Sequence, residues 1–215
     1  MTALSVAFDV DGTVVDSLAG ARGAAEDILE LFGVSVCIVD RTTMHKHFGR
    51  AALIKQFGES GIPISLIHPL LMRVRTLVDP PRVFDGLKDV IECVATATGE
   101  LPTFFTAGYS DAAKEALAAA GIGPAQVSGR EAGSKTEQLA RWAATRPGAR
   151  YVCDTVTDVN RCRAAGVQAV GVAWGYDALT DLKRAGALPV RSPTDLLSVL
   201  LDPIEKKENH ATDRT

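Results

Sequence analysis

Two aspartates one residue apart, Asp9 and Asp11, are the first residues in the chain whose type and spacing suit chemistry. Asp9 lies near the end of residues 4–10, an apolar segment bounded by polar residues that is typical of a buried strand, and Asp11 follows that segment. Gly12 and Thr13 end that segment, so the sequence predicts both carboxyl groups at the carboxyl end of a strand. A lone pair of this kind is most often a turn or a helix cap. The pair indicates a reactive site only if other functional residues join it.

Such residues follow other segments of the chain that are predicted to be strands. Thr106 ends the apolar segment 101–106, and Asp154 ends the segment 151–154, with Asp158 one helical turn further on. Lys135 stands at the start of a predicted helix. Ligands of open parallel sheets bind beyond the carboxyl ends of the strands. We therefore expect these carboxylates, the lysine and the hydroxyl to meet at one edge of the sheet.

This set of groups suits phosphoryl transfer. Crowded carboxylates repel one another unless a cation lies among them, and a site made only of oxygen ligands favours Mg²⁺. One carboxylate can attack phosphorus to form an aspartyl-phosphate, while a second protonates the leaving oxygen and then activates water. A lysine can neutralise the phosphoryl oxygens. Thr106 and the backbone N–H groups after the first strand can hold the phosphate.

The elements that must position these residues change in character near residue 82. Beyond it, strands and helices alternate, which predicts a parallel sheet covered by helices on both faces. The predicted strands are 101–106, 126–128, 151–154 and 168–173, with a short one at 188–190, and the predicted helices are 87–97, 111–120, 136–145, 159–165, 177–185 and 193–201. Between residues 17 and about 80 the pattern is helical only, over 21–32, 41–57 and 64–78.

The predicted fold class is therefore α/β, with a Rossmann-like parallel sheet core and an inserted all-helical cap domain. We expect residues 1–16 and 83–203 to form the core and residues 17–82 to form the cap. The polar segment 204–215 is predicted to be a disordered tail.

Composition narrows the classes of partner and compartment. The net charge of −3 excludes a broad basic surface for nucleic acid. The N-terminal segment lacks the pattern of a signal peptide, and no apolar run of roughly 18 residues predicts a membrane span. Four scattered cysteines favour reduced thiols in a cytoplasmic protein. Monomer and dimer both remain open.

Four segments together resemble the motifs of the haloacid dehalogenase superfamily, in its phosphatase branch. Residues 8–17, with the sequence FDVDGTVVDS, resemble the first motif, and Thr106 resembles the second. Residues 133–135 (GSK) resemble the third motif, and residues 154–158 (DTVTD) resemble the acidic fourth motif. The resemblance covers roughly residues 4–200 and is strongest to phosphoglycolate-phosphatase-like members, which carry a helical cap.

The resemblance implies a role for each charged residue and Mg²⁺ as the cofactor. Asp9 is expected to be the nucleophile and a metal ligand, and Asp11 the general acid and base, with its backbone carbonyl on the metal. Asp154 is expected to bind the metal, and Asp158 to support it directly or through water. Lys135 is expected to orient Asp9 and the phosphate.

The resemblance also implies where the substrate binds. Thr106, Ala107, Gly12 and Thr13 are expected to hold the phosphate. Gly49 and Arg50, in the predicted cap, are expected to contact the rest of the substrate. The implied activity is hydrolysis of a small phosphomonoester, such as a phosphoglycolate-like compound or a sugar phosphate.

Two positions depart from the family pattern, and other functions stay open. Ala107 stands where Asn is frequent, which removes an amide donor, and Cys153 stands where Gly is usual, which is expected to narrow the site.

A phosphomutase of the same superfamily and a catalytically idle member that binds a phospho-ligand are both compatible with the motifs. Asp11 disfavours the dehalogenase and phosphonate-cleaving branches, and the insertion disfavours a phosphorelay receiver domain. Trp174 and Tyr176 are expected to pack beside the site.

Overall fold

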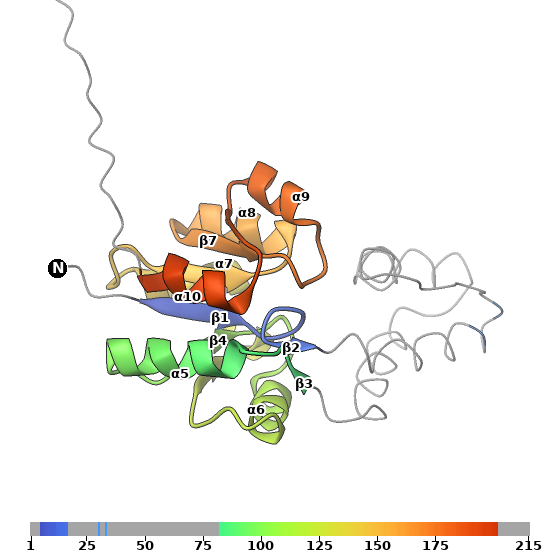
Figure 1. Cartoon of the computed structure of the whole chain (residues 1–215), viewed down its shortest axis with the longest axis vertical. Coiled ribbons are helices and arrows are strands. Elements are labelled where there is room, and N and C mark those ends of the chain that lie inside the picture. Colours follow the sequence, from blue (N-terminus) through green and yellow to red (C-terminus); the bar gives the residue numbers. More distant parts are fainter. Residues whose placement is uncertain (1–4, 17–29, 31–32, 34–81, 202–215) are drawn as a thin grey trace, which may run out of the picture.

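A six-stranded parallel sheet forms the centre of the molecule. The computed structural model describes residues 5–16, 30, 33 and 82–201. Every neighbouring pair of strands is parallel, in the order β5-β4-β1-β6-β7-β8. Figure 1 labels β1, β4 and β7 of this sheet. The strands are β1 (Val6–Asp9), β4 (Thr103–Phe105), β5 (Gln126–Ser128), β6 (Arg150–Cys153), β7 (Gln168–Val172) and β8 (Leu188–Val190). The predicted α/β core with a parallel sheet is confirmed.

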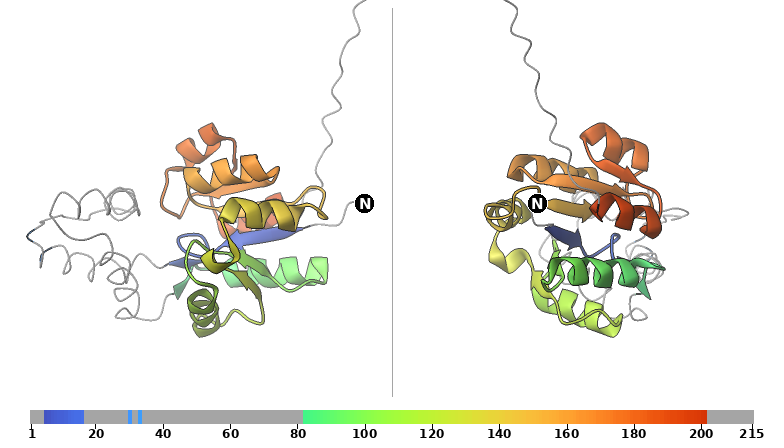
Figure 2. Two further views of the ribbon diagram at one scale, coloured as in Figure 1. Left: turned by 180° about the vertical axis from the view of Figure 1, so that it is seen from behind. Right: turned by 60° about the vertical axis from the view of Figure 1, so that its left-hand side comes forward.

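Helices cover both faces of this sheet (Figure 2). Phe8 of β1 packs into a cluster with apolar residues of α5 (Leu87–Thr98), α6 (Ser110–Ala119) and α10 (Pro193–Leu201). Ala7, whose side chain points to the opposite face, packs into a second cluster with α7 (Lys135–Ala143), α8 (Val156–Ala165) and α9 (Leu179–Ala185). Because both faces are covered, all four residues of β1 are buried, which explains why the three residues before Asp9 are apolar.

The order of the strands reverses at β1. The chain continues from β1 to β4 and β5 on one side, and then crosses to β6, β7 and β8 on the other. A crevice forms beyond the carboxyl ends of the strands at such a switch point, and it is the usual ligand site of open α/β sheets. β1 ends at Asp9, so this residue lies at the switch point.

A second, two-stranded sheet lies just beyond β1. β2 (Val15–Asp16) pairs antiparallel with β3 (Arg82–Val83), which places Asp16 opposite Arg82. This pairing joins the two ends of the stretch predicted to be a cap. That predicted cap, apart from residues 30, 33 and 82, and the predicted tail lie outside the described residues.

Most predicted boundaries in the core differ from the structure by one or two residues, and α8 differs by more. It begins at Val156 rather than at residue 159, because the Thr155 hydroxyl accepts a hydrogen bond from the Asp158 N–H at 3.2 Å and caps the helix. Asp158 therefore lies in the first turn of α8. A short 3₁₀ helix, η1 (Arg130–Ala132), also precedes α7 and was not predicted.

Candidate active site

Asp9 lies at the end of β1 and is paired with Lys135. Its Oδ1 atom accepts hydrogen bonds from Lys135 Nζ at 2.9 Å and from the Val10 N–H at 2.8 Å. Both side chains are buried, with 9% and 4% of their surfaces exposed. Burial raises the pKa of Asp9 well above its ordinary value, and the neighbouring carboxylates of Asp158 and Asp154 raise it further. The charge of Lys135 lowers the pKa of Asp9 but does not offset the effect of burial.

Lys135 bridges Asp9 to a second buried carboxylate. Its Nζ atom also donates to Asp158 Oδ2 at 2.8 Å, and it lies 5.7 Å from the centre of the Tyr151 ring. Although burial disfavours the ammonium, the two carboxylates raise the pKa of Lys135 above its ordinary value. Burial also opposes ionisation of Asp158, but Lys135, Asp9 and Arg161 together outweigh it and lower the pKa of Asp158 to about 2. The lysine is therefore charged at neutral pH.

Local sequence fixes the start of α7, where Lys135 stands. Ser134 caps the helix: its side chain accepts from the Glu137 N–H, and the Glu137 carboxylate accepts from the Ser134 N–H. The amide of Gln138 donates to the carbonyl groups of Gly129 and Gly133, each at 2.8 Å. These bonds hold both ends of the η1 turn and so fix the approach of Lys135 to the site.

The turn after β1 carries Asp11, Gly12 and Thr13. Gly12 has a φ of +78°, and a Cβ atom there would overlap the Asp154 carboxylate and the Tyr176 ring. Only glycine meets both requirements. The Thr106 hydroxyl lies 3.5 Å from Asp11 Oδ2 and accepts a 2.9 Å hydrogen bond from the Gly108 N–H. The ends of β1 and β4 thus place a carboxyl and a hydroxyl together.

Asp154 follows β6 and is completely buried. Its Oδ1 accepts from the Thr13 hydroxyl at 2.9 Å, and its Oδ2 accepts from the Tyr176 N–H at 2.8 Å. Burial raises the pKa of Asp154 to about 7, and these two hydrogen bonds only partly oppose the effect. A Cβ atom on Gly175 would overlap the Asp154 side chain, so that glycine allows the loop to approach.

Asp158 makes a second ion pair on the side away from Lys135. Its Oδ1 atom contacts Arg161 Nη1 at 2.6 Å, within the first turns of α8. Both oxygens of this carboxylate therefore accept from a cationic side chain. The prediction that Asp158 supports a metal directly or through water stays a prediction.

The structure brings most of the predicted site residues into three groups of contacts. These contacts join Asp9 with Lys135 and Asp158, Asp11 with Thr106, and Thr13 with Asp154. Ala107 is exposed in the loop after Thr106. Gly49 and Arg50 lie outside the described residues.

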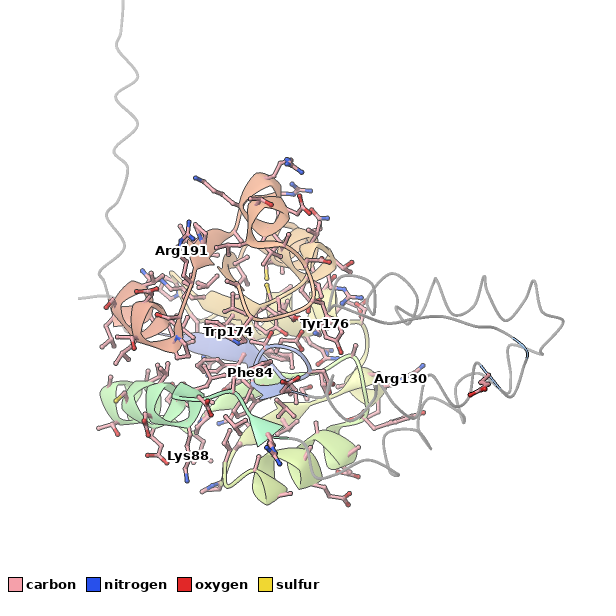
Figure 3. The ribbon with its side chains drawn as sticks, turned by 45° about the vertical axis from the view of Figure 1, so that its right-hand side comes forward. Phe84, Lys88, Arg130, Trp174, Tyr176 and Arg191 are labelled. Atoms are coloured by element: carbon pink, nitrogen blue, oxygen red, sulfur yellow. The ribbon has the colours of Figure 1, made fainter. Side chains whose placement is uncertain are left out.

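Cys153, expected to narrow the site, instead packs into the core. It is fully buried in the cluster beneath α8, against Cys162. Trp174 and Tyr176 lie beside the site as expected: the Trp174 indole N–H donates to the Thr13 carbonyl at 2.9 Å, and its ring lies 6.3 Å from that of Phe84 (Figure 3).

Sequence reasoning missed three contributors to the site. The Tyr176 N–H and the space at Gly175 both act on Asp154 from the loop after β7, and Arg161 acts on Asp158. Backbone donors and close approaches leave no signal in residue type. Arg161 is three residues from Asp158 on a helix, a spacing at which an ion pair is common, and this spacing was the one usable signal.

The carboxylates suit a divalent cation in charge and in donor type. Four acidic residues (Asp9, Asp11, Asp154 and Asp158) face two basic ones (Lys135 and Arg161), which leaves a formal excess of two negative charges. Asp9 and Asp154 both have raised pKa values, because Lys135 at Asp9 and the two hydrogen bonds at Asp154 do not fully offset the effect of burial. No three His, Cys, Asp or Glu side chains are grouped as metal ligands within the described ranges. The carboxylates of Asp9 and Asp154 and the backbone carbonyl of Asp11 would make a set with only two acidic side chains, and water would complete the coordination of the ion.

Comparison with known proteins identifies the fold. No family model and no curated protein matches the sequence. Among solved structures, a candidate phosphoglycolate phosphatase from Lactobacillus delbrueckii is similar, with a TM-score of 0.79 and 16% identity over 94% of this chain and 100% of that one. A haloacid dehalogenase-like hydrolase from Streptococcus pneumoniae has a TM-score of 0.73 and 18% identity, covering 91% and 97% of the two chains.

A candidate β-phosphoglucomutase from Thermotoga maritima is similar as well. Its TM-score is 0.61 at 18% identity, over 93% of this chain and 98% of that chain. None of the helices in the described part of the chain is long and apolar enough to cross a membrane. The chain has the fold of the haloacid dehalogenase-like hydrolases, as the resemblance of its motifs implies.

Proposed function

We propose that the protein is a Mg²⁺-dependent phosphatase that hydrolyses a small phosphomonoester through an aspartyl-phosphate. The observation that carries this proposal is the buried contact between Asp9 and Lys135 at the switch point of the sheet, next to Asp11. A carboxylate held beside a charged ammonium has a nucleophile and a partner for the phosphoryl oxygens in one place. A structural ion pair needs neither the switch-point position nor a second carboxyl group two residues on.

In the first step, Asp9 attacks phosphorus and the bond to the leaving oxygen breaks. Lys135 Nζ and the Val10 N–H both bind Oδ1 of Asp9, so we assign the attack to Oδ2. Asp11, in its protonated form, donates a proton to the departing oxygen, which leaves as an alcohol. Lys135 and Thr106 hold the non-bridging phosphoryl oxygens during the transfer.

In the second step, water hydrolyses the aspartyl-phosphate. Asp11, now ionised, accepts a proton from the water while its oxygen attacks phosphorus. The bond between phosphorus and Asp9 breaks, which releases inorganic phosphate and restores both carboxyl groups. The contact between Asp11 and the Thr106 hydroxyl lies beside the path of this proton.

Asp9, the Asp11 carbonyl and Asp154 would hold the Mg²⁺ ion. When bound, the ion neutralises charge on the phosphoryl group and on the buried carboxylates. Thr13 and the Tyr176 N–H orient Asp154 toward this role, since each of them binds one of its oxygens. Their hydrogen bonds fix the carboxylate plane before any ion arrives.

A phosphomutase reaction is the second candidate, because one similar structure is described as a β-phosphoglucomutase. It would use the same aspartyl-phosphate and pass the phosphoryl group to a sugar hydroxyl instead of water. The two functions differ in product, so one assay separates them. Phosphatase action releases inorganic phosphate, and mutase action yields an isomeric sugar phosphate.

The test is release of phosphate from an aryl phosphate and from a panel of small phosphorylated metabolites, with and without Mg²⁺. We expect activity with Mg²⁺ that falls at least about a thousandfold in Asp9→Asn. Asp111→Asn, which changes an exposed aspartate on α6, is the matched control and should retain full activity. A wild-type protein that turns over none of these compounds with Mg²⁺ present would refute the proposal.

A further inference from the structure

Charged side chains form a continuous row from the site to the surface of α8. Asp9 contacts Lys135 at 2.9 Å, Lys135 contacts Asp158 at 2.8 Å, and Asp158 contacts Arg161 at 2.6 Å. The signs alternate along the row. The first three side chains are at most 9% exposed, whereas the Arg161 side chain is 36% exposed. The row therefore ends at its most exposed member.

We propose that Arg161 is a positioning residue that holds Asp158 on Lys135 and keeps Asp158 from binding the cation. This inference rests on the proposed phosphatase function. Arg161 binds Oδ1 of Asp158 and Lys135 binds Oδ2, so the carboxylate cannot turn toward a metal ion without losing a cationic partner. The fixed carboxylate in turn fixes Lys135 Nζ against Asp9 Oδ1.

Loss of Arg161 would leave a buried carboxylate oxygen without its cationic partner. An unpaired buried charge is costly, so Asp158 would seek another cation. The Mg²⁺ ion proposed to lie between Asp9 and Asp154 is the nearest candidate, because Lys135 Nζ contacts Asp158 Oδ2 at 2.8 Å and Asp9 Oδ1 at 2.9 Å, which places the Asp158 carboxylate beside that of Asp9. A carboxylate that moves to the ion releases Lys135, and Asp9 loses its alignment.

An internal comparison separates this ion pair from an ordinary surface pair. Arg184 and Asp181 on α9 have the same three-residue spacing and a 2.7 Å contact, but their side chains are 78% and 49% exposed. Exposed pairs of this kind contribute little to stability. Arg184→Ala therefore removes the same type of residue and the same charge from a helix, without touching the site.

The experiment compares wild type, Arg161→Ala, Arg161→Lys and Arg184→Ala in two measurements. Steady-state phosphatase kinetics give kcat and KM, and calorimetric titration with Mg²⁺ gives the Kd of the ion without turnover. For Arg161→Ala we expect kcat to fall about tenfold, as for other residues that orient site groups, with KM within about twofold. We expect its Mg²⁺ Kd to be about threefold lower or more, since a nearby positive charge is gone.

Rescue completes the test. Arg161→Lys keeps the positive charge and is expected within about threefold of wild-type kcat, and added guanidinium ion is expected to raise kcat of Arg161→Ala alone. An Arg161→Ala variant that matches Arg184→Ala in kcat would overturn the inference, as would weaker Mg²⁺ binding, which indicates general loosening. A wild type without turnover refutes the phosphatase proposal, and the Mg²⁺ titrations then still decide the role of Arg161.

Discussion

Replacement of Asp154 by Asn should stabilise the metal-free protein at alkaline pH. Asp154 is completely buried, and burial raises its pKa from 3.8 to about 7. That shift of about three pH units corresponds to roughly 4 kcal/mol against the ionised form. Asn preserves the shape of the side chain: its oxygen can accept from the Tyr176 N–H, and its amide can donate to the Thr13 hydroxyl. The variant removes the charge and keeps both contacts.

The direction of the effect follows from proton binding. Between pH 3.8 and about 7 the folded protein holds a proton on Asp154 that the unfolded chain has lost, so the free energy of unfolding falls as pH rises. Asp9, whose pKa is also raised by burial, acts in the same direction and remains in the variant. Asp158, with a pKa lowered to about 2, contributes stability that is lost only as pH falls below 3.8.

Urea unfolding with a chelator present, at about pH 4.5 and about pH 8, measures the effect. We expect similar stabilities at the lower pH, and Asp154→Asn more stable by a few kcal/mol at the higher pH. Asp111→Asn, at an exposed position, should match wild type at both values. Added Mg²⁺ should stabilise wild type at the higher pH and have little effect on Asp154→Asn. An Asp154→Asn variant that is less stable than wild type at the higher pH would refute this account of the buried charge.

Two further substitutions test the same site. Lys135→Met leaves Asp9 and Asp158 buried without their shared cation, so phosphatase activity should vanish and the free energy of unfolding at neutral pH should fall by about 3–5 kcal/mol in urea titrations. Unchanged stability would show that the ion pairs contribute nothing net. Gly175→Ala adds a methyl group that overlaps the Asp154 side chain, and calorimetry should show Mg²⁺ binding weakened about 10- to 100-fold. Wild-type affinity in that variant would mean that the loop yields without moving Asp154.

The core could be predicted from the sequence because each strand is a short apolar run, and turn-forming or polar residues separate it from a helix. β1 is buried on both faces, so its apolar sequence is unbroken, and Asp9 marks its end. By contrast, the strands β2 and β3 are two residues each and come from distant parts of the chain. A pairing that short leaves no periodicity to detect.

In the site, likewise, the charged side chains could be predicted from the sequence, whereas the contacts made by the backbone could not. Asp9, Lys135 and Asp154 were predictable, because charged residues at strand and helix ends are conspicuous. The Tyr176 N–H that binds Asp154 was not, since every residue except proline carries such a donor. The start of α8 was misplaced because Thr155 and Thr157 are both suitable caps by type, and only geometry selects Thr155.

The two-stranded sheet of β2 and β3 has a consequence for how proteins with this architecture diversify. Asp16 lies opposite Arg82, so the two positions that flank residues 17–81 are adjacent in the structure. Exchange or lengthening of that stretch leaves the spacing of Asp9, Lys135 and Asp154 in the core untouched. If residues 17–82 form a cap as predicted, the pairing of β2 with β3 lets that cap change in length or sequence while the reactive residues of the core stay in place.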